Sequence, residues 1–269
     1  MLAELAEADA PPEIASIYAE MRHTTGAPMV ALIWRHLATM PGVLAEVWRG
    51  LGPLYRSGRL QDAAWRAAAV NVQAAPADVG RARLIAAGLD DSGIAAFERV
   101  LEAYNRVNPV NFIAVRALLH AMRGSAAGGH VNAMPPWTPP DPVGALPAMA
   151  PISAIAGEPR RLIDALSSNP GQDRSTVVPT LYRHLTDWPT LIPLVHEALI
   201  ERFQSGEIAH EIRRVADAID GEAQRLASML PPLDQLKARP EVMAVLDRFS
   251  LIIPEMIVVG LLLQRGVKA

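Results

Sequence analysis

The chain has 269 residues, of which 51% are hydrophobic, and it carries a formal net charge of −3 at pH 7. This apolar content is ample for a packed core, and because no basic run stands out, nucleic acid and anionic membrane surfaces are poor candidate partners. The chain contains no cysteine, which excludes disulfides, thiol nucleophiles and thiolate metal sites.

The two ends of the chain bear on its localisation. Residues 1–7 are acidic and lack the basic region and apolar core of a signal peptide. The longest apolar run, residues 251–263, contains Pro254 and Glu255 and is shorter than the ~20 apolar residues that a membrane-spanning helix needs. We therefore expect a cytoplasmic protein without a membrane span.

Alanine and leucine dominate, and alternating β-branched residues are scarce, so helix is expected almost throughout. Apolar residues recur at helical spacing, with prolines, glycines and capping residues at the predicted ends. In the first half this pattern predicts helices at residues 12–21, 30–37, 41–51, 62–73, 76–87, 94–104 and 109–123. A break is expected at residues 105–108, with Pro109 beginning a new helix. In the second half, helices are predicted at residues 159–166, 207–229, 241–249 and 254–263.

A segment of the first half returns in the second. Residues 35–41, with the sequence RHLATMP, match residues 183–189, RHLTDWP, at a separation of 148 residues. The apolar positions after each proline also coincide. In both halves an aromatic residue, Tyr104 or Phe249, lies five residues before a proline. The residue directly before that proline is Asn108 in the first copy and Ile253 in the second.

We interpret this likeness as a duplication, which predicts an all-α fold of two tandem helical repeats. The repeats are assigned to residues 1–123 and 152–269. Between them, residues 124–151 are rich in proline and glycine and are predicted to be an extended linker lying against the surface through Trp137 and Leu146.

Several of these segments together resemble a known family. They are Pro28, residues 38–42 (ATMPG), 87–91 (AGLDD) and 104–109 (YNRVNP), and the pair Trp188-Pro189. In this order and spacing the chain resembles the group I 2-haloacid dehalogenases over nearly its full length. The resemblance implies two tandem repeats, a homodimer, a site between the repeats and hydrolytic removal of halide from a small carboxylic acid. In that family an Asp and an Asn activate the attacking water, so no metal or cofactor is expected.

The family's residues transfer only in part. Asn108 matches the asparagine that orients the water. The catalytic aspartate, seven residues before the Trp-Pro pair, maps onto Leu181, which follows Thr180. The aromatic wall of the family pocket maps onto Met29 and Leu32. These four residues, Met29, Leu32, Thr180 and Leu181, are the predicted substrate-binding positions.

With no aspartate at position 181, another residue would have to act as the base. Tyr182, His184 and Asp187 are candidates, and Asp173 in residues 167–173 is a further one. Each has a structural alternative: Tyr182 packs, His184 has a repeat-related role with its counterpart His36, and Asp187 caps a helix. Asn108 before a proline is likewise typical of a helix start.

Two functions are therefore open at this stage. The first is a hydrolase of the dehalogenase type that uses Asn108 and a relocated base. The second is a non-catalytic protein that binds a small carboxylic acid or serves as a scaffold, which the leucine at position 181 favours because a leucine accepts no proton. A cavity containing Asn108 and an ionisable group would favour the enzyme.

Overall fold

The structure is a computed structural model that describes residues 3–124, 137–149, 151–167 and 178–269. All regular secondary structure in these ranges is helical, as predicted. The α-helices of the first half are α1 (Pro12–Thr25), α2 (Leu32–Leu37), α3 (Val43–Arg56), α4 (Arg59–Asn71), α5 (Arg81–Ala86) and α6 (Asp91–Arg123). Those of the second half are α7 (Gly157–Ser167), α8 (Thr180–His184), α9 (Leu191–Gln204), α10 (Glu207–Ala227), α11 (Asp234–Lys237) and α12 (Pro240–Lys268). Short 3-10 helices are η1 (Glu7–Asp9), η2 (Ile152–Ala154) and η3 (Leu185–Asp187).

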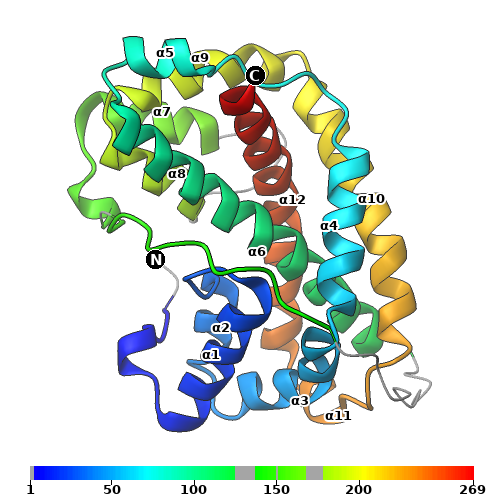
Figure 1. The fold of residues 1–269 in the computed structure, drawn as a ribbon. Helices are drawn as coiled ribbons and strands as arrows, with labels where there is room; N and C mark the ends of the chain where they lie inside the picture. The colour runs from blue at the N-terminus through cyan, green and yellow to red at the C-terminus, as the bar shows by residue number, and fades with distance from the viewer. Residues whose placement is uncertain (1–2, 125–136, 150, 168–177) are drawn as a thin grey trace.

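The two longest helices, α6 and α12, pack against each other through the middle of the molecule (Figure 1). Helices α4 and α10 lie side by side along one flank of this pair, and α10 also packs on α6. Helices α1 and α3 gather at one end, and α7 and α9 lie at the other. One continuous apolar core contains residues of both halves, so the halves share their buried surface.

The ends of the helices follow local rules of sequence. Pro12 occupies the first turn of α1, and Gly26 ends that helix with φ of 63°, a conformation that glycine adopts without steric cost. Asp90 caps α6, because its side chain accepts a hydrogen bond from the Gly93 backbone N–H at 2.7 Å. The helix predicted from Pro41 begins instead at Val43, after Gly42 with φ of 74°.

The predicted break at residues 105–108 is wrong. Helix α6 runs unbroken for 33 residues with Pro109 inside it, and α12 runs for 29 residues with Pro254 inside it, where two separate helices were predicted. An internal proline costs a helix ~3 kcal/mol. Burial of both helices along their length outweighs that cost, and the Trp65 indole N–H supports the turn before Pro109 by donating to the Arg106 carbonyl oxygen at 2.9 Å.

The helix predicted at residues 76–87 is much shorter, because tertiary contacts override the local pattern. Only Arg81–Ala86 is helical. The Ala77 N–H donates to the Leu262 carbonyl oxygen of α12 at 3.0 Å, and Arg202 donates to the Ala75 carbonyl oxygen at 2.8 Å. These bonds hold the segment extended against the second half.

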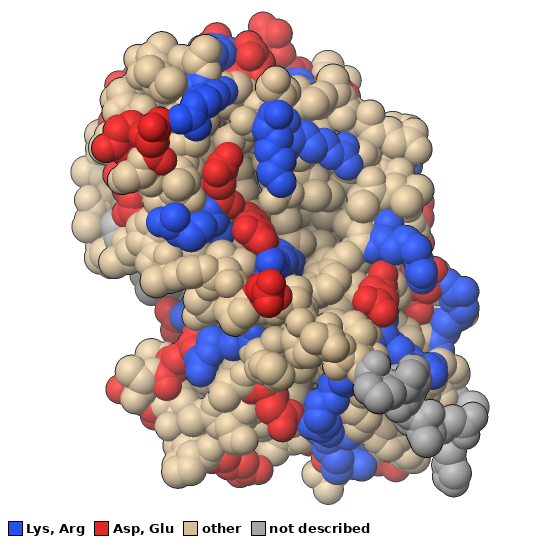
Figure 2. Space-filling view, in the orientation of Figure 1, with Lys and Arg blue, Asp and Glu red and all other residues tan. Residues whose placement is uncertain are grey.

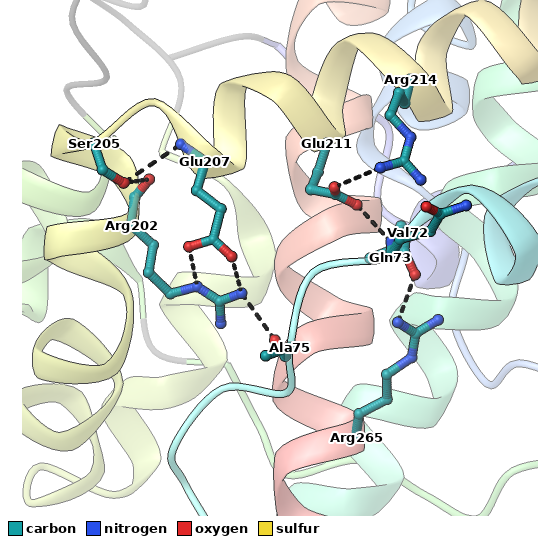
Figure 3. A network of polar contacts seen from close by, with 9 residues as sticks. All are labelled: Val72, Gln73, Ala75, Arg202, Ser205, Glu207, Glu211, Arg214 and Arg265. Carbon is teal, nitrogen blue, oxygen red and sulfur yellow. Dashed lines mark hydrogen bonds and ion pairs between the residues drawn. The ribbon is translucent and has the colours of Figure 1, made fainter.

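A polar network attaches this segment to three helices of the second half (Figure 3). Glu211 of α10, which is buried, accepts from the Gln73 backbone N–H at 2.6 Å and from Arg214 at 3.0 Å. Arg265 of α12 donates to the Val72 carbonyl oxygen at 2.6 Å. Arg202 of α9 reaches the same segment, so the chain after α4 is held by hydrogen bonds at each of these points.

The part of the predicted linker that the structure describes, residues 137–149, has no helix and lies against the first half, as expected. The Val143 N–H donates to the Gly26 carbonyl oxygen at 2.7 Å, and Arg106 donates to the Asp141 carbonyl oxygen at 2.5 Å. Figure 1 shows this green segment crossing the molecule beside α2 and α6. The rest of the linker, residues 125–136 and 150, lies outside the described residues, and the repeat boundaries and the homodimer stay predictions.

The described helices include none with the length and apolar character needed to cross a membrane. On the face drawn in Figure 2, basic and acidic side chains are interspersed, without a field of one sign.

Candidate functional site

A cavity of about 430 Å³ lies where α2, α6, α8, α12 and the extended segment meet. Twenty-three residues line it: Pro28, Met29, Val30, Ala31, Leu32, Ile33 and Arg35 around α2; Tyr104, Val107, Asn108 and Asn111 on α6; Ala145, Leu146, Pro147 and Met149 on the extended segment; Val178, Pro179, Thr180 and His184 at α8; and Phe249, Ile252, Ile253 and Met256 on α12. Convergence of several elements on one mostly apolar cavity with a few polar groups is typical of a ligand site.

The α6 and α12 walls are built from corresponding positions, separated by 145 residues in each case. The pairs are Tyr104 with Phe249, Val107 with Ile252, Asn108 with Ile253, and Asn111 with Met256. These positions share one face of each helix, since they follow the spacing of successive turns. The cavity therefore lies where a duplicated chain would place a site between its halves, but its two sides differ in polarity.

Asn108 lies inside α6, well away from its N-cap at Asp90, so it is not the helix cap that the sequence suggested. Its side chain lines the cavity, and its amide nitrogen Nδ2 is buried without a hydrogen-bond partner among the described residues. An unsatisfied buried donor costs ~1–3 kcal/mol.

Arg35 adds a positive charge to the cavity wall, and sequence reasoning missed it. One guanidinium nitrogen, Nη2, pairs with Glu4 at 2.9 Å, while Nε is buried without a partner among the described residues. The described residues that line the cavity include no Asp or Glu, so its electrostatics favour an anion. Arg35 opens the first copy of the repeated segment, but that position in the sequence does not show that it lines a cavity.

Tyr104 and His184 form a hydrogen-bonded pair on the cavity wall. The Tyr104 hydroxyl oxygen lies 2.8 Å from His184 Nδ1, and the two rings meet edge to face with centroids 5.5 Å apart. Burial lowers the pKa of His184, although the carbonyl groups of Pro147 and Thr180 act in the opposite direction. Burial raises the pKa of Tyr104. Both side chains are therefore neutral at pH 7, and each already has a partner.

The next polar residue along α6, Asn111, also has a hydrogen-bond partner. The Asn111 side-chain oxygen accepts a hydrogen bond from the Trp34 indole N–H at 2.8 Å. Asn111 is buried, so this bond fixes the orientation of its amide beside the cavity. Within the described lining, Asn108 Nδ2 and Arg35 Nε are thus the buried donors without a partner.

Two residues of α8 predicted to belong to the site lie outside the cavity lining. Leu181 is buried in the hydrophobic core. Tyr182 is also buried, and its hydroxyl donates to Glu255 Oε1 at 3.2 Å. Thr180, the preceding residue, does line the cavity. A carboxylate on this helix would therefore face the cavity from position 180 and the core from position 181.

Asp187 and His36 also lie apart from the lining residues. Asp187 ends η3, and α9 begins without a side-chain cap, so the predicted capping role is wrong. Burial raises the pKa of Asp187. His36 Nδ1 lies 2.6 Å from the Ala3 carbonyl oxygen and is not paired with His184, which contacts Tyr104 instead. Asp173 lies outside the described residues.

The cavity thus brings together five of the sequence-predicted site residues: Met29, Leu32, Asn108, Thr180 and His184. Within the described ranges, no cluster of three or more histidine, aspartate or glutamate side chains is arranged to hold a metal ion.

Known proteins share both the fold and the sequence pattern. No family model matches the chain. Among solved structures, a D-2-haloacid dehalogenase in complex with L-LA superposes with a TM-score of 0.78 at 17% identity, covering 99% of this chain and 96% of that one. A D-2-haloacid dehalogenase mutant superposes with a TM-score of 0.80 at 16% identity, over the same shares of the two chains. The fold is therefore that of the 2-haloacid dehalogenases.

Sequence comparison points to the same class of protein. The chain is 26% identical to a configuration-inverting 2-haloacid dehalogenase from Alcaligenes xylosoxydans xylosoxydans, with 91% of this chain and 88% of that protein aligned. Similarity along nearly the whole of both chains supports homology to the 2-haloacid dehalogenases.

Proposed function

We propose that the cavity binds a carboxylic acid of the 2-haloacid class. The observation that carries this proposal is the presence of Arg35 and Asn108 in the lining, with no Asp or Glu among the described lining residues. Each of the two also has a buried nitrogen, Arg35 Nε and Asn108 Nδ2, without a partner among the described residues. A carboxylate accepts hydrogen bonds through both oxygens and complements the guanidinium charge. The ligand named for the homologous dehalogenase belongs to this chemical class.

Hydrolytic removal of halide is the second candidate function. Similarity to a configuration-inverting dehalogenase favours it, and Asn108 has the amide needed to orient a water molecule. The water oxygen would bond to the α-carbon while the carbon–halogen bond breaks and its electron pair leaves with the halide. The remaining requirement is a base that takes the proton from water.

Of the candidate bases that the structure describes, Tyr182, His184 and Asp187, it is His184 that lines the cavity. A neutral imidazole can accept a proton, but its Nδ1 would first have to leave the Tyr104 hydroxyl, which lies 2.8 Å away. Position 180 carries a threonine and position 181 a core leucine, neither of which can serve as a base. We therefore propose ligand binding, rather than catalytic turnover, as the function of this site.

Measuring halide release from racemic 2-chloropropionate distinguishes ligand binding alone from catalysis. We expect no release by the wild-type protein above the uncatalysed rate, and release by Thr180→Asp, because that variant puts a carboxylate on the cavity wall. Leu181→Asp is the matched control: it places the same group in the core, so it should destabilise the fold without supporting turnover.

If the wild-type protein releases halide and the Asn108→Ala and His184→Asn variants do not, then catalysis is the function of the site. The protein would then be a dehalogenase with a relocated base. Equal release by Thr180→Asp and Leu181→Asp would contradict the assignment of position 180 to the cavity. Thermal unfolding of each variant separates loss of chemistry from loss of fold.

A further inference from the structure

The two sides of the cavity differ in a way that constrains the shape of its ligand. The α6 wall carries polar groups at three of its four lining positions, while the corresponding α12 wall is apolar throughout. The polar side is formed by Tyr104, Asn108 and Asn111, and the apolar side by Phe249, Ile252, Ile253 and Met256. A ligand that complements both has a polar head and an apolar body.

The size of the cavity indicates how large that apolar body is. Ligand pockets for drug-sized molecules typically measure ~300–1,000 Å³, and a cavity of about 430 Å³ falls within this range. At roughly 30 Å³ per non-hydrogen atom, the volume of one water in the liquid, a three-carbon haloacid would occupy less than about half of it. The remainder would leave the apolar wall facing water that finds few hydrogen-bond partners there.

From this mismatch we propose that the site prefers carboxylic acids with an apolar chain, on the order of eight carbons in all, over two- and three-carbon acids. The inference rests on the proposed function, because it assigns the carboxylate to Asn108 and Arg35. The chain would then lie along the α12 wall, where Ile252 and Met256 present apolar side chains.

The remaining walls agree with a chain of this kind. Met29, Met149 and Met256 all line the cavity, and unbranched thioether side chains adapt readily to flexible apolar ligands. Leu32 adds a branched aliphatic side chain to the same lining as Met29. Leu146 of the extended segment adds a further apolar contact.

Isothermal titration calorimetry with straight-chain acids from propionate to decanoate tests the proposal. Each buried methylene contributes about 0.8 kcal/mol, so affinity should rise about fourfold per added carbon at least as far as octanoate, whose non-hydrogen atoms would take about 300 Å³ of the cavity at the same volume per atom. The control ligand is 1-octanol, which has the same chain without the charge and should bind at least tenfold more weakly than octanoate.

Two variants locate the chain. Ile252→Phe, which fills the apolar side, should lower the ratio of octanoate to propionate affinity at least tenfold, and Met256→Phe should act in the same direction. Leu251→Phe is the matched control, because Leu251 is the neighbouring residue on α12 and its side chain is 62% exposed outside the cavity. That variant should leave the ratio unchanged.

The outcomes separate this inference from the function on which it rests. Propionate binding with no gain from longer chains would overturn the preference for long acids and leave the carboxylate site intact. An undiminished ratio in both Ile252→Phe and Met256→Phe would overturn the placement of the chain. Absence of binding by every acid would overturn the proposed function itself.

Discussion

At the scale of single residues, the site depends on which polar groups already have partners. Tyr104 and His184 contact each other and Asn111 bonds to Trp34, whereas Asn108 Nδ2 and Arg35 Nε do not have partners among the described residues. The first group shapes the wall, and the second is available to a ligand. This division gives the cavity hydrogen-bond donors and a positive charge, which suit a carboxylate.

The sequence could identify part of this site but not its orientation. Five predicted residues line the cavity: the repeated segment suggested His184, and the resemblance to the dehalogenases suggested Met29, Leu32, Asn108 and Thr180. The spacing could not decide between Thr180 and Leu181, since one step along a helix turns a side chain by about 100°. Arg35 escaped notice because an arginine is usually exposed, and only its position in three dimensions shows that its Nε is buried beside the cavity.

The state of His184 leads to a prediction about pH. Burial holds its folded-state pKa below the ordinary value of 6.5, so the unfolded chain binds a proton first as pH falls. The stability associated with the neutral ring is present above pH 6.5 and is lost as pH falls toward the folded-state pKa, with a slope approaching ~1.4 kcal/mol per pH unit.

Urea unfolding between pH 8 and 5 measures this loss. The His184→Asn variant should lose less stability over the interval than the wild-type protein. His23→Asn, which removes an exposed histidine on α1, should follow the wild-type curve. Parallel curves for the wild-type protein and His184→Asn would show that His184 has the same pKa in the folded and unfolded states.

At the scale of elements, tertiary packing overrode two predictions made from local sequence. It continued helices where prolines predicted an end, and it prevented a helix where one was predicted. The prolines at positions 109 and 254 failed to end helices, because α6 and α12 bury each other along their length. Residues 76–80 did not form a helix, because the Ala77 N–H bonds to α12 and the preceding Ala75 carbonyl accepts from Arg202. The spacing of apolar residues could not predict either outcome, because it carries information only about neighbours within one chain segment.

Glu211 is the residue through which α10 holds this extended segment. Its buried carboxylate accepts from the Gln73 backbone N–H at 2.6 Å and from Arg214 at 3.0 Å. Glu211→Ala would leave both donors without this acceptor, so we expect a loss of about 2–3 kcal/mol in the free energy of unfolding, measured in urea.

The matched control lies on the same helix. Glu222 pairs with Arg225 at the surface, where such pairs contribute ~0–1 kcal/mol, so Glu222→Ala should cost less than 1 kcal/mol. Equal losses in the two variants would contradict a special role for Glu211 in holding the segment after α4.

At the scale of the whole molecule, the two predicted halves share one core, with α6 and α12 as its central pair. The residues of α6 that line the cavity have equivalents at the same relative positions in α12. The match of Tyr104 with Phe249 in the sequence already indicated this equivalence. The all-helical class was predictable from composition and spacing. The cavity's volume and the covering of one side by residues 145–149 arise from tertiary packing alone.

Divergence of the two predicted repeats would account for an asymmetric ligand at the proposed site. Asn108 and Asn111 give the α6 side its polarity, and Ile253 and Met256 make the α12 side apolar. A symmetric cavity would present the same surface to both ends of a ligand. In the proposed complex, the carboxylate of the ligand lies on the polar side and its apolar body on the other.

Carboxylate binding at Arg35 can be tested by comparing the affinity of the wild-type protein for a carboxylic acid with that of Arg35→Met. We predict that calorimetry with octanoate detects one site per chain and that Arg35→Met weakens it at least tenfold, since a charged hydrogen bond contributes ~1.5–3 kcal/mol. Arg49→Met is the control, because Arg49 is an exposed residue of α3 outside the cavity lining. Wild-type binding that Arg35→Met and Arg49→Met leave equally unchanged would contradict the account.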